Sequence, residues 1–174
     1  APPPWFTPAL PNYGMMFPQS VGAVLPGSGA DEETEVTWFA ADPAMVTVAR
    51  QVAQDVKLYV SPLGLSIEDC TPVDACLTHI PVIKVGGNGV SGPTFVDNAA
   101  YREYVWNTWQ ADALDMESSA VAHVAAVNGV PFVIFRSLSD LAGGGPGENE
   151  IGTFFQLAAI NSARVMLAFL SAWE

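Results

Sequence analysis

The chain has 174 residues, of which 50% are hydrophobic and 14% are charged. This balance is typical of one globular α/β or mixed domain that buries most of its apolar surface. Eighteen acidic residues against six basic ones give a net charge of −12, which makes nucleic-acid polymers and acidic membranes poor candidate partners. We expect no membrane span, because no apolar run approaches the roughly 20 residues that a bilayer requires, and no signal peptide remains.

The first part of the chain predicts an irregular segment over residues 1–35, followed by the main domain over residues 36–174. The segment is rich in Pro and contains the acidic, glycine-punctuated stretch GSGADEETE, which is typical of a surface loop. Residues 36–39 (VTWF) predict a short strand. Apolar residues then recur at helical spacing, and Asp42 can cap a helix whose first residue is Pro43.

The middle of the chain alternates between strand and helix signals. Residues 80–87 (IPVIKVGG) predict a strand that ends in the glycine loop GGNGVSG, and DNAAYREYVWNTW predicts a helix that Asp97 can cap. The stretch ADALDM predicts a short strand. Residues 118–127 predict a helix that ends at an Asn–Gly pair, a favourable left-handed stop.

The last part of the chain begins with residues 130–135 (VPFVIF), which are apolar throughout and predict a central parallel strand covered on both faces. The final helix is expected to begin at Thr153, with Gln156 three residues later completing a capping box. Strands and helices therefore alternate along the chain. This order predicts an α/β fold, a three-layer α/β/α sandwich around a mostly parallel or mixed sheet.

Ligands of such sheets bind outside the carboxyl ends of the strands, where GNGVSGPTF, LDMES and RSLSD are expected to meet. Asp140 follows Ser137 and Ser139 there, which favours a functional carboxylate over one that only ties a loop. Glu117 could be a first-turn carboxylate favoured by the helix dipole, or it could accept hydrogen bonds from a sugar diol. Phe95 could be a core aromatic or a ligand contact.

The two cysteines, Cys70 and Cys76, lie six residues apart in CTPVDAC. We expect a disulfide, worth about 2 to 2.5 kcal/mol by loop entropy, which would imply an oxidising compartment. Two free thiols remain an alternative, and a metal site would need more ligands than these cysteines and His79 supply. His123 lies in an apolar helix and is expected to be a core residue.

Three separated stretches carry a resemblance: GNGVSGPTFVDNAAYREYV, ALDMESSAVAHVAAVNGVPFVIFRSLSDLAGG and GTFFQLAAINSARVMLAFL. They resemble the nucleoside phosphorylase and nucleosidase superfamily, in particular the branch that cleaves methylthioadenosine and adenosylhomocysteine. WFAADP, the paired cysteines and SDLAGG are similar to plant bark storage and wound-inducible proteins built on that fold. The resemblance extends from about residue 36 to the end of the chain.

This resemblance implies how a purine nucleoside would be bound. Phe95 would stack on the purine, and the backbone of Val96 would bond to its edge. Met116 and Glu117 would hold the ribose, Glu117 through the sugar hydroxyls.

The resemblance also implies that Asp140 protonates the base on its imidazole side, while Ser139 steadies the carboxyl group. Protonation turns the base into a neutral leaving group as the glycosidic bond breaks. A free Asp would need about 4 kcal/mol to be protonated at pH 7, so burial would have to raise its pKa. The glycine loop after Asp140 could fold over the base and exclude water.

The function expected from the resemblance is N-glycosidic cleavage of a purine nucleoside, with no cofactor and no metal. The alternatives are plant storage or defence with a vestigial pocket, and a nucleoside-binding module without turnover. We expect a secreted or vacuolar protein, because of the disulfide, and a homo-oligomer.

Family enzymes begin with a part of the fold that has no counterpart here, including a glycine-rich phosphate or water site and a water-activating carboxylate. A parallel sheet without its first strands exposes an apolar edge, which proteins avoid. The sequence also starts without Met, with APPPW. We therefore expect a carboxyl-terminal part of a longer precursor, with a further N-terminal peptide that completes the sheet.

Overall fold

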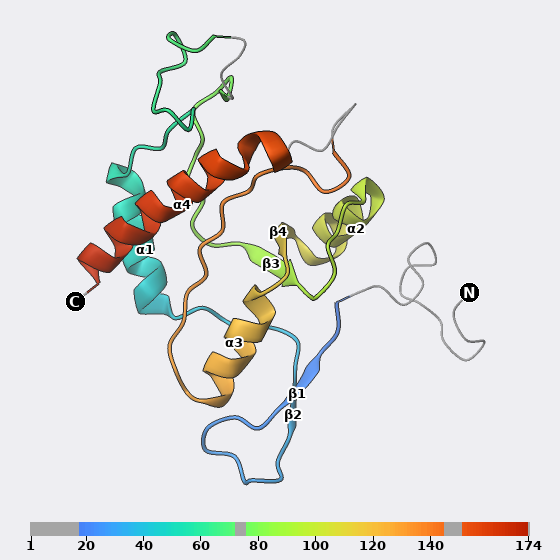
Figure 1. Cartoon of the computed structure of the whole chain (residues 1–174). Helices are drawn as coiled ribbons and strands as arrows, with labels where there is room; N and C mark the ends of the chain where they lie inside the picture. Colours follow the sequence, from blue (N-terminus) through green and yellow to red (C-terminus); the bar gives the residue numbers. More distant parts are fainter. Residues whose placement is uncertain (1–17, 72–75, 145–150, 174) are drawn as a thin grey trace.

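The computed structural model describes residues 18–71, 76–144 and 151–173 (Figure 1). Helices and strands alternate along most of this part of the chain. In order, the elements are β1 (Val21–Ala23), β2 (Thr34–Val36), α1 (Pro43–Asp55), β3 (Asn88–Ser91), α2 (Ala99–Trp109), β4 (Ala111–Asp115), α3 (Ser118–Val127) and α4 (Ile151–Ala172).

The strands form two separate pairs. β1 and β2 are antiparallel, with Val21 opposite Val36, and β3 and β4 are parallel, with Ser91 opposite Asp115. The predicted α/β class is confirmed, with both parallel and antiparallel pairing. Within the described residues, however, the strands do not join into one continuous sheet.

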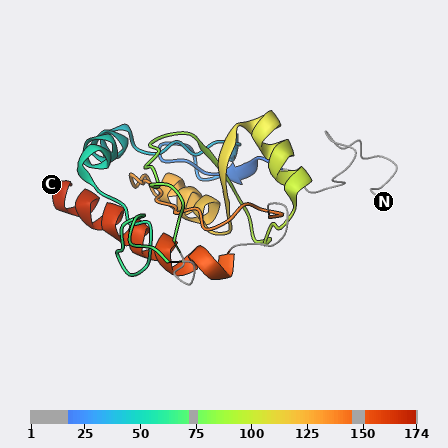
Figure 2. The same ribbon diagram turned by 90° about the horizontal axis from the view of Figure 1, so that it is seen from above.

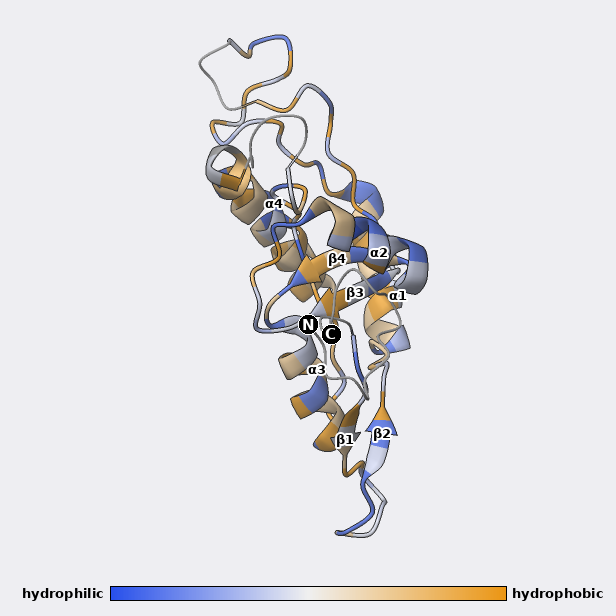
Figure 3. Cartoon of the chain, turned by 90° about the vertical axis from the view of Figure 1, so that its right-hand side faces the viewer, coloured by the Kyte–Doolittle hydropathy of each residue, from blue (hydrophilic) through white to orange (hydrophobic). Residues whose placement is uncertain are grey.

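The short hairpin of β1 and β2 corrects the expectation that residues 1–35 are irregular. Its connection turns at Gly27, which has φ +90°, and Ser28 donates a backbone hydrogen bond to Leu25 at 3.1 Å. The strand predicted over residues 36–39 therefore ends at Val36 instead. The hairpin projects from the opposite end of the molecule to the disulfide-bearing segment (Figures 1 and 3). Residues 1–17 lie outside the described residues.

α1 and α3 agree with the predictions made from their capping residues. The Asp42 carboxylate accepts a hydrogen bond from the Met45 amide at 2.9 Å, and Pro43 is the first residue of α1. α3 ends at Val127, and Gly129 adopts the left-handed conformation, with φ +64°. Such capping signals are read locally, so they do not depend on the rest of the fold.

Two other helix starts differ from the predictions. α2 is capped by Asn98, whose side chain accepts from the Tyr101 amide at 2.8 Å. Asp97 instead accepts from the Gly143 amide at 2.7 Å, because a distant loop reaches it. α4 begins at Ile151, so Thr153 lies in its first turn and is not its cap.

Two predicted strands are absent among the described residues. Residues 80–87 and 130–135 run without strand pairing, and the parallel strand lies at β3, inside the predicted glycine loop. Gly86 and Gly87 have φ +96° and +97°, which interrupts the extended chain before β3. A strand also needs a neighbouring strand to hydrogen-bond. Among the described residues the backbone of 80–87 forms no hydrogen bond, and that of 130–135 forms only those from Val130 to Ala125 and from Asp42 to Phe132.

The core that positions the site lies between α2 and the β3–β4 pair. Tyr101, Tyr104 and Val105 of α2 are buried with Ala111 of β4. His123 is half-buried in α3 and stacks on Phe39, with ring centroids 5.4 Å apart. The histidine thus makes the aromatic contact expected of a packing residue, but it is not among the buried core residues.

α4 packs against α1, on the side of the molecule away from α2 (Figure 2). The expectation that no segment is long and apolar enough to cross a membrane is wrong for α4. Its window Phe154–Ala172 passes that test by length and composition, and 17% of the window is buried. The buried residues of α4 are Leu157, Asn161 and Phe169, and the Phe169 ring lies edge-on to Phe135.

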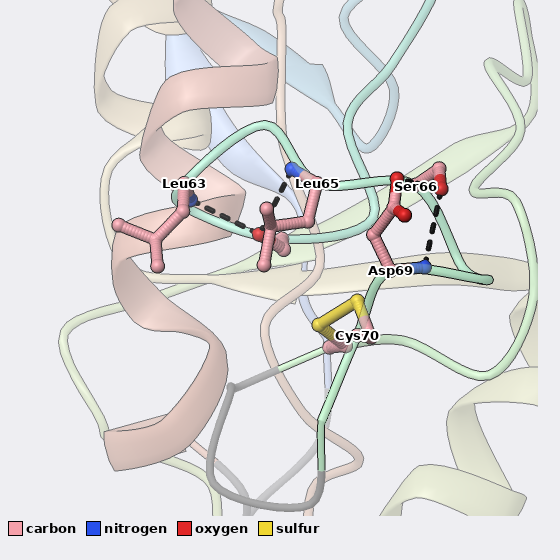
Figure 4. The surroundings of a disulfide bond; sticks show 7 residues. Leu63, Leu65, Ser66, Asp69 and Cys70 are labelled. Carbon is pink, nitrogen blue, oxygen red and sulfur yellow. Dashed lines mark hydrogen bonds between the residues drawn. A yellow bond between two sulfur atoms is a disulfide. The ribbon is translucent and has the colours of Figure 1, made fainter.

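The predicted disulfide between Cys70 and Cys76 is present, with the Cα atoms 6.3 Å apart (Figure 4). The preceding turns are tied by side chains. Buried Ser61 accepts from the Leu63 amide at 3.0 Å, and Ser66 donates to the Asp69 carboxylate at 2.6 Å.

Candidate functional site

The predicted site residues line one pocket of about 290 Å³. It lies along β4 and reaches the carboxyl ends of β3 and β4, where ligands of parallel sheets bind. Residues of β4 and α2 line it together with the segments that follow β3, β4 and the apolar run. The candidate residues that it brings together are Phe95, Val96, Met116, Glu117, Ser139 and Asp140.

The aromatic wall follows β3. The chain leaves β3 through a tight turn in which the Thr94 amide donates to the Gly92 carbonyl at 2.7 Å, and Phe95 comes next. The Phe95 side chain is 59% exposed although it lines the pocket, so it is not the core aromatic of the alternative reading. An exposed aromatic face at a pocket can stack on a planar ligand.

The acidic wall follows β4, and Asp115 organises it. Its carboxylate accepts from the Glu117 and Ser118 amides at 3.1 and 2.9 Å, and also from the Ser118 hydroxyl. Asp115 therefore caps α3, and Glu117 makes no side-chain cap bond. The Glu117 carboxylate therefore does not bond to the first turn of α3, as one alternative expected.

Arg136 is one of two site residues, with Arg102, that the sequence did not predict. Its guanidinium lies 3.0 Å from Glu117 Oε2 and 2.8 Å from Asp115 Oδ2. It therefore links the end of the apolar run to the acidic wall and orients the Glu117 carboxylate. A basic residue directly after an apolar run, in a chain with only six basic residues, was the available signal.

The pKa of Asp115 lies below its ordinary value. Burial acts to raise the pKa, but hydrogen bonds from serines, above all Ser118, and the positive charge of Arg136 outweigh it. Asp115 therefore stays ionised to lower pH than a free aspartate and keeps holding Arg136.

The third wall carries Ser139 and Asp140. The Ser139 hydroxyl donates to Asp140 Oδ1 at 2.7 Å, and both residues are half-buried. This contact fixes one carboxylate oxygen. The other oxygen of Asp140 is the one that could exchange a proton with a ligand.

A second cavity of about 480 Å³ lies between α1 and α4 and contains no candidate residue. Its Arg164 is already engaged: Nε donates to the Lys57 carbonyl at 3.0 Å, and the guanidinium lies over the Tyr59 ring. We therefore assign the smaller pocket as the candidate site. In the part of the chain that the structure describes, no group of three or more His, Cys, Asp or Glu side chains could hold a metal ion.

A pocket that reaches strand ends, with an exposed aromatic ring and carboxylates in its lining, is the kind of site at which an α/β protein can bind a small polar ligand. Comparison with known proteins gives the family. The family model of the phosphorylase superfamily matches residues 16–171. The chain therefore belongs to this superfamily.

Two relatives share the name 5'-methylthioadenosine/S-adenosylhomocysteine nucleosidase. The protein from Treponema pallidum is 40% identical over 80 residues, which are 46% of this chain and 29% of that protein. The protein from Halalkalibacterium halodurans is 38% identical over 82 residues, 47% of this chain and 35% of that protein. No solved structure matches the chain. The finer resemblance to plant storage proteins stays a prediction.

Proposed function

We propose that this chain provides the nucleoside-binding part of an enzyme that cleaves the N-glycosidic bond of a purine nucleoside. One observation carries the proposal: Phe95, Glu117 and Asp140, from three separate segments, line the same pocket. The names of the two bacterial relatives support the substrate class.

In the proposed reaction Phe95 stacks on the purine and the Val96 backbone bonds to its edge. Glu117, oriented by Arg136, accepts hydrogen bonds from the ribose hydroxyls, and Met116 packs against the sugar. These contacts fix the sugar relative to the base, so the bond between them lies at a defined place in the pocket.

Asp140 acts as the general acid. It donates its proton to the imidazole-side nitrogen of the base while the glycosidic bond breaks, so the base departs neutral and the sugar carbon becomes positively charged. Ser139 holds the first carboxyl oxygen, which leaves the proton on the second. Water then adds to the sugar carbon and loses a proton, or phosphate adds as an anion, which completes the cleavage, and Asp140 regains a proton from solvent.

A further polypeptide, the N-terminal part of the same precursor, is proposed to complete the sheet. Among the described residues, the backbone of residues 80–85 forms no hydrogen bond, and that of residues 132–139 forms only one, from Asp42 to the Phe132 carbonyl at 2.8 Å. Val82 is 88% exposed beside this unpaired backbone. Such edges are normally paired or covered.

The compartment and the assembly are also proposals. The disulfide supports a secreted or vacuolar location, because such bonds persist in oxidising compartments. The exposed apolar side chains of α4, including Phe155 and Leu167, support a homo-oligomer.

The deciding experiment measures adenine release from methylthioadenosine and from adenosine, each with and without phosphate. Release would support the proposal, and its dependence on phosphate would identify the co-substrate. Absence of both adenine binding and release would refute it. Binding without release, in an abundant plant protein, would favour the storage alternative.

A further inference from the structure

The short segment after Asp140, residues 141–144, is fastened to the start of α2. The Gly143 amide donates to Asp97 Oδ1 at 2.7 Å, and Arg102 Nη1 donates to the Ala142 carbonyl at 2.6 Å. A weaker bond of 3.4 Å joins Arg102 to the Gly144 carbonyl. The acidic side chain thus binds a backbone amide of this segment, and the basic side chain binds its backbone carbonyls.

The close fit at Gly143 shows that this contact is specific. Gly143 has φ +82°, and a Cβ atom there would lie 2.1 Å from the Ala99 amide nitrogen. Any larger residue would push the segment off α2. A backbone hydrogen bond of 2.7 Å from Gly144 to Leu141 closes the segment into a turn.

The fastening joins two walls of the candidate pocket. Phe95 lies two residues before Asp97, and Asp140 comes directly before the gripped turn. Arg102 itself lines the pocket between them. Among the described residues Arg102 forms no ion pair, so its charge acts on the backbone carbonyls of this turn.

We propose that Asp97 and Arg102 are positioning residues that latch the turn of residues 141–144 onto α2 and thereby set Asp140 opposite Phe95. The latch itself depends only on these contacts. Its effect on the ligand rests on the proposed function, since it assumes that adenine occupies the pocket. Without the latch the acid would move relative to the base, which weakens catalysis and binding even when every direct ligand contact is intact.

Two measurements test the latch, on Arg102→Met, Arg102→Lys and Asp97→Ala. Backbone hydrogen exchange at residues 141–144 should become about tenfold faster or more in Arg102→Met and Asp97→Ala, the size expected when a hydrogen bond to a charged group is lost. Arg102→Lys keeps the charge and should lie between these variants and the wild type. Arg50→Met removes an exposed positive charge from α1, outside the pocket, and should leave exchange at the turn unchanged.

Adenine affinity, measured by titration calorimetry, is the second readout. It should fall about tenfold in Asp97→Ala, at a residue that is not part of the pocket lining, while exchange within α2 stays as in the wild type. Unchanged exchange at the turn would overturn the latch. Faster exchange with unchanged adenine affinity would overturn its link to the pocket. Faster exchange in a protein whose wild type binds no adenine would uphold the latch and refute the proposed function.

Discussion

Asp140 accepts a hydrogen bond from Ser139 at 2.7 Å and lines the same pocket as Phe95. In the proposed reaction its proton is the one that the base receives. Changing Asp140 to Asn keeps the size of the side chain and removes the acid. Turnover should fall by about 10²-fold or more, the scale of a lost general acid, while adenine still binds.

Steady-state adenine release measures this effect, and equilibrium binding of adenine checks the pocket. Asp31→Asn, at an exposed carboxylate between β1 and β2, is the matched control and should retain full turnover. Equal turnover in Asp140→Asn and in the wild type would remove Asp140 from the mechanism.

Phe95 gives a second test at a single residue. Truncation to Ala should weaken adenine binding by about 1 to 3 kcal/mol, the usual contribution of a base stacked on an aromatic ring. The free energy of unfolding should change little, because the side chain is mostly exposed without ligand. Phe155→Ala removes an equally exposed ring from α4 and should leave affinity unchanged. A Phe95→Ala variant that unfolds but keeps its affinity when folded would restore the core interpretation.

The N-terminus of α3 depends on the ionised form of Asp115. Because the pKa of Asp115 is lowered in the folded protein, its contribution to stability is present above the ordinary Asp pKa of about 3.9 and is lost as the pH falls through the lower folded value. Asp115→Asn keeps an acceptor for the α3 amides but not the charge. Its stability should therefore be below that of the wild type at neutral pH, and the difference should shrink in acid.

Urea unfolding at a series of pH values between neutral and 3 measures this difference. Asp31→Asn again serves as the control for simple loss of an acidic charge. If the difference in the free energy of unfolding between the wild type and Asp115→Asn stayed constant over the whole pH series, the charge of Asp115 would not stabilise α3.

At the level of elements, sequence patterns predicted helices better than strands. α1 was predicted by apolar spacing and by Asp42, which are both local features. Residues 130–135 are as apolar as a buried strand, but a strand exists only where another segment pairs with it. The sequence predicted Asp97 as the cap of α2, but the cap is Asn98, because Asp97 instead contacts a loop more than 40 residues away.

The candidate site was predictable to the extent that its residues follow strands or apolar runs. Phe95, Glu117 and Asp140 share that position, and they meet in the pocket. Arg136 and Arg102 were missed, because their partners are carboxylates and carbonyls brought near by folding. No periodic pattern in the sequence marks such contacts.

For the molecule as a whole, the proposed covering partner rests on the backbone of residues 80–85 and 132–139, which forms a single hydrogen bond among the described residues. We expect protein purified from its natural source and then denatured to contain a further polypeptide, either separate or continuous with this chain. Mass spectrometry of the intact, denatured protein gives the masses of the polypeptides present. Native mass spectrometry is the control that shows whether two such polypeptides are associated. A single 174-residue chain that is monomeric and unfolds cooperatively would contradict the expectation.

Asn161 is buried in α4, and its side chain both accepts a hydrogen bond from the backbone of Tyr59 and donates one to it. Its Oδ1 accepts from the Tyr59 amide at 2.8 Å, and its Nδ2 donates to the Tyr59 carbonyl at 2.9 Å. An amide side chain can do both, whereas a carboxylate can only accept. Deamidation of Asn161 would therefore set a carboxylate oxygen against the Tyr59 carbonyl and weaken the contact that holds α4 to residue 59.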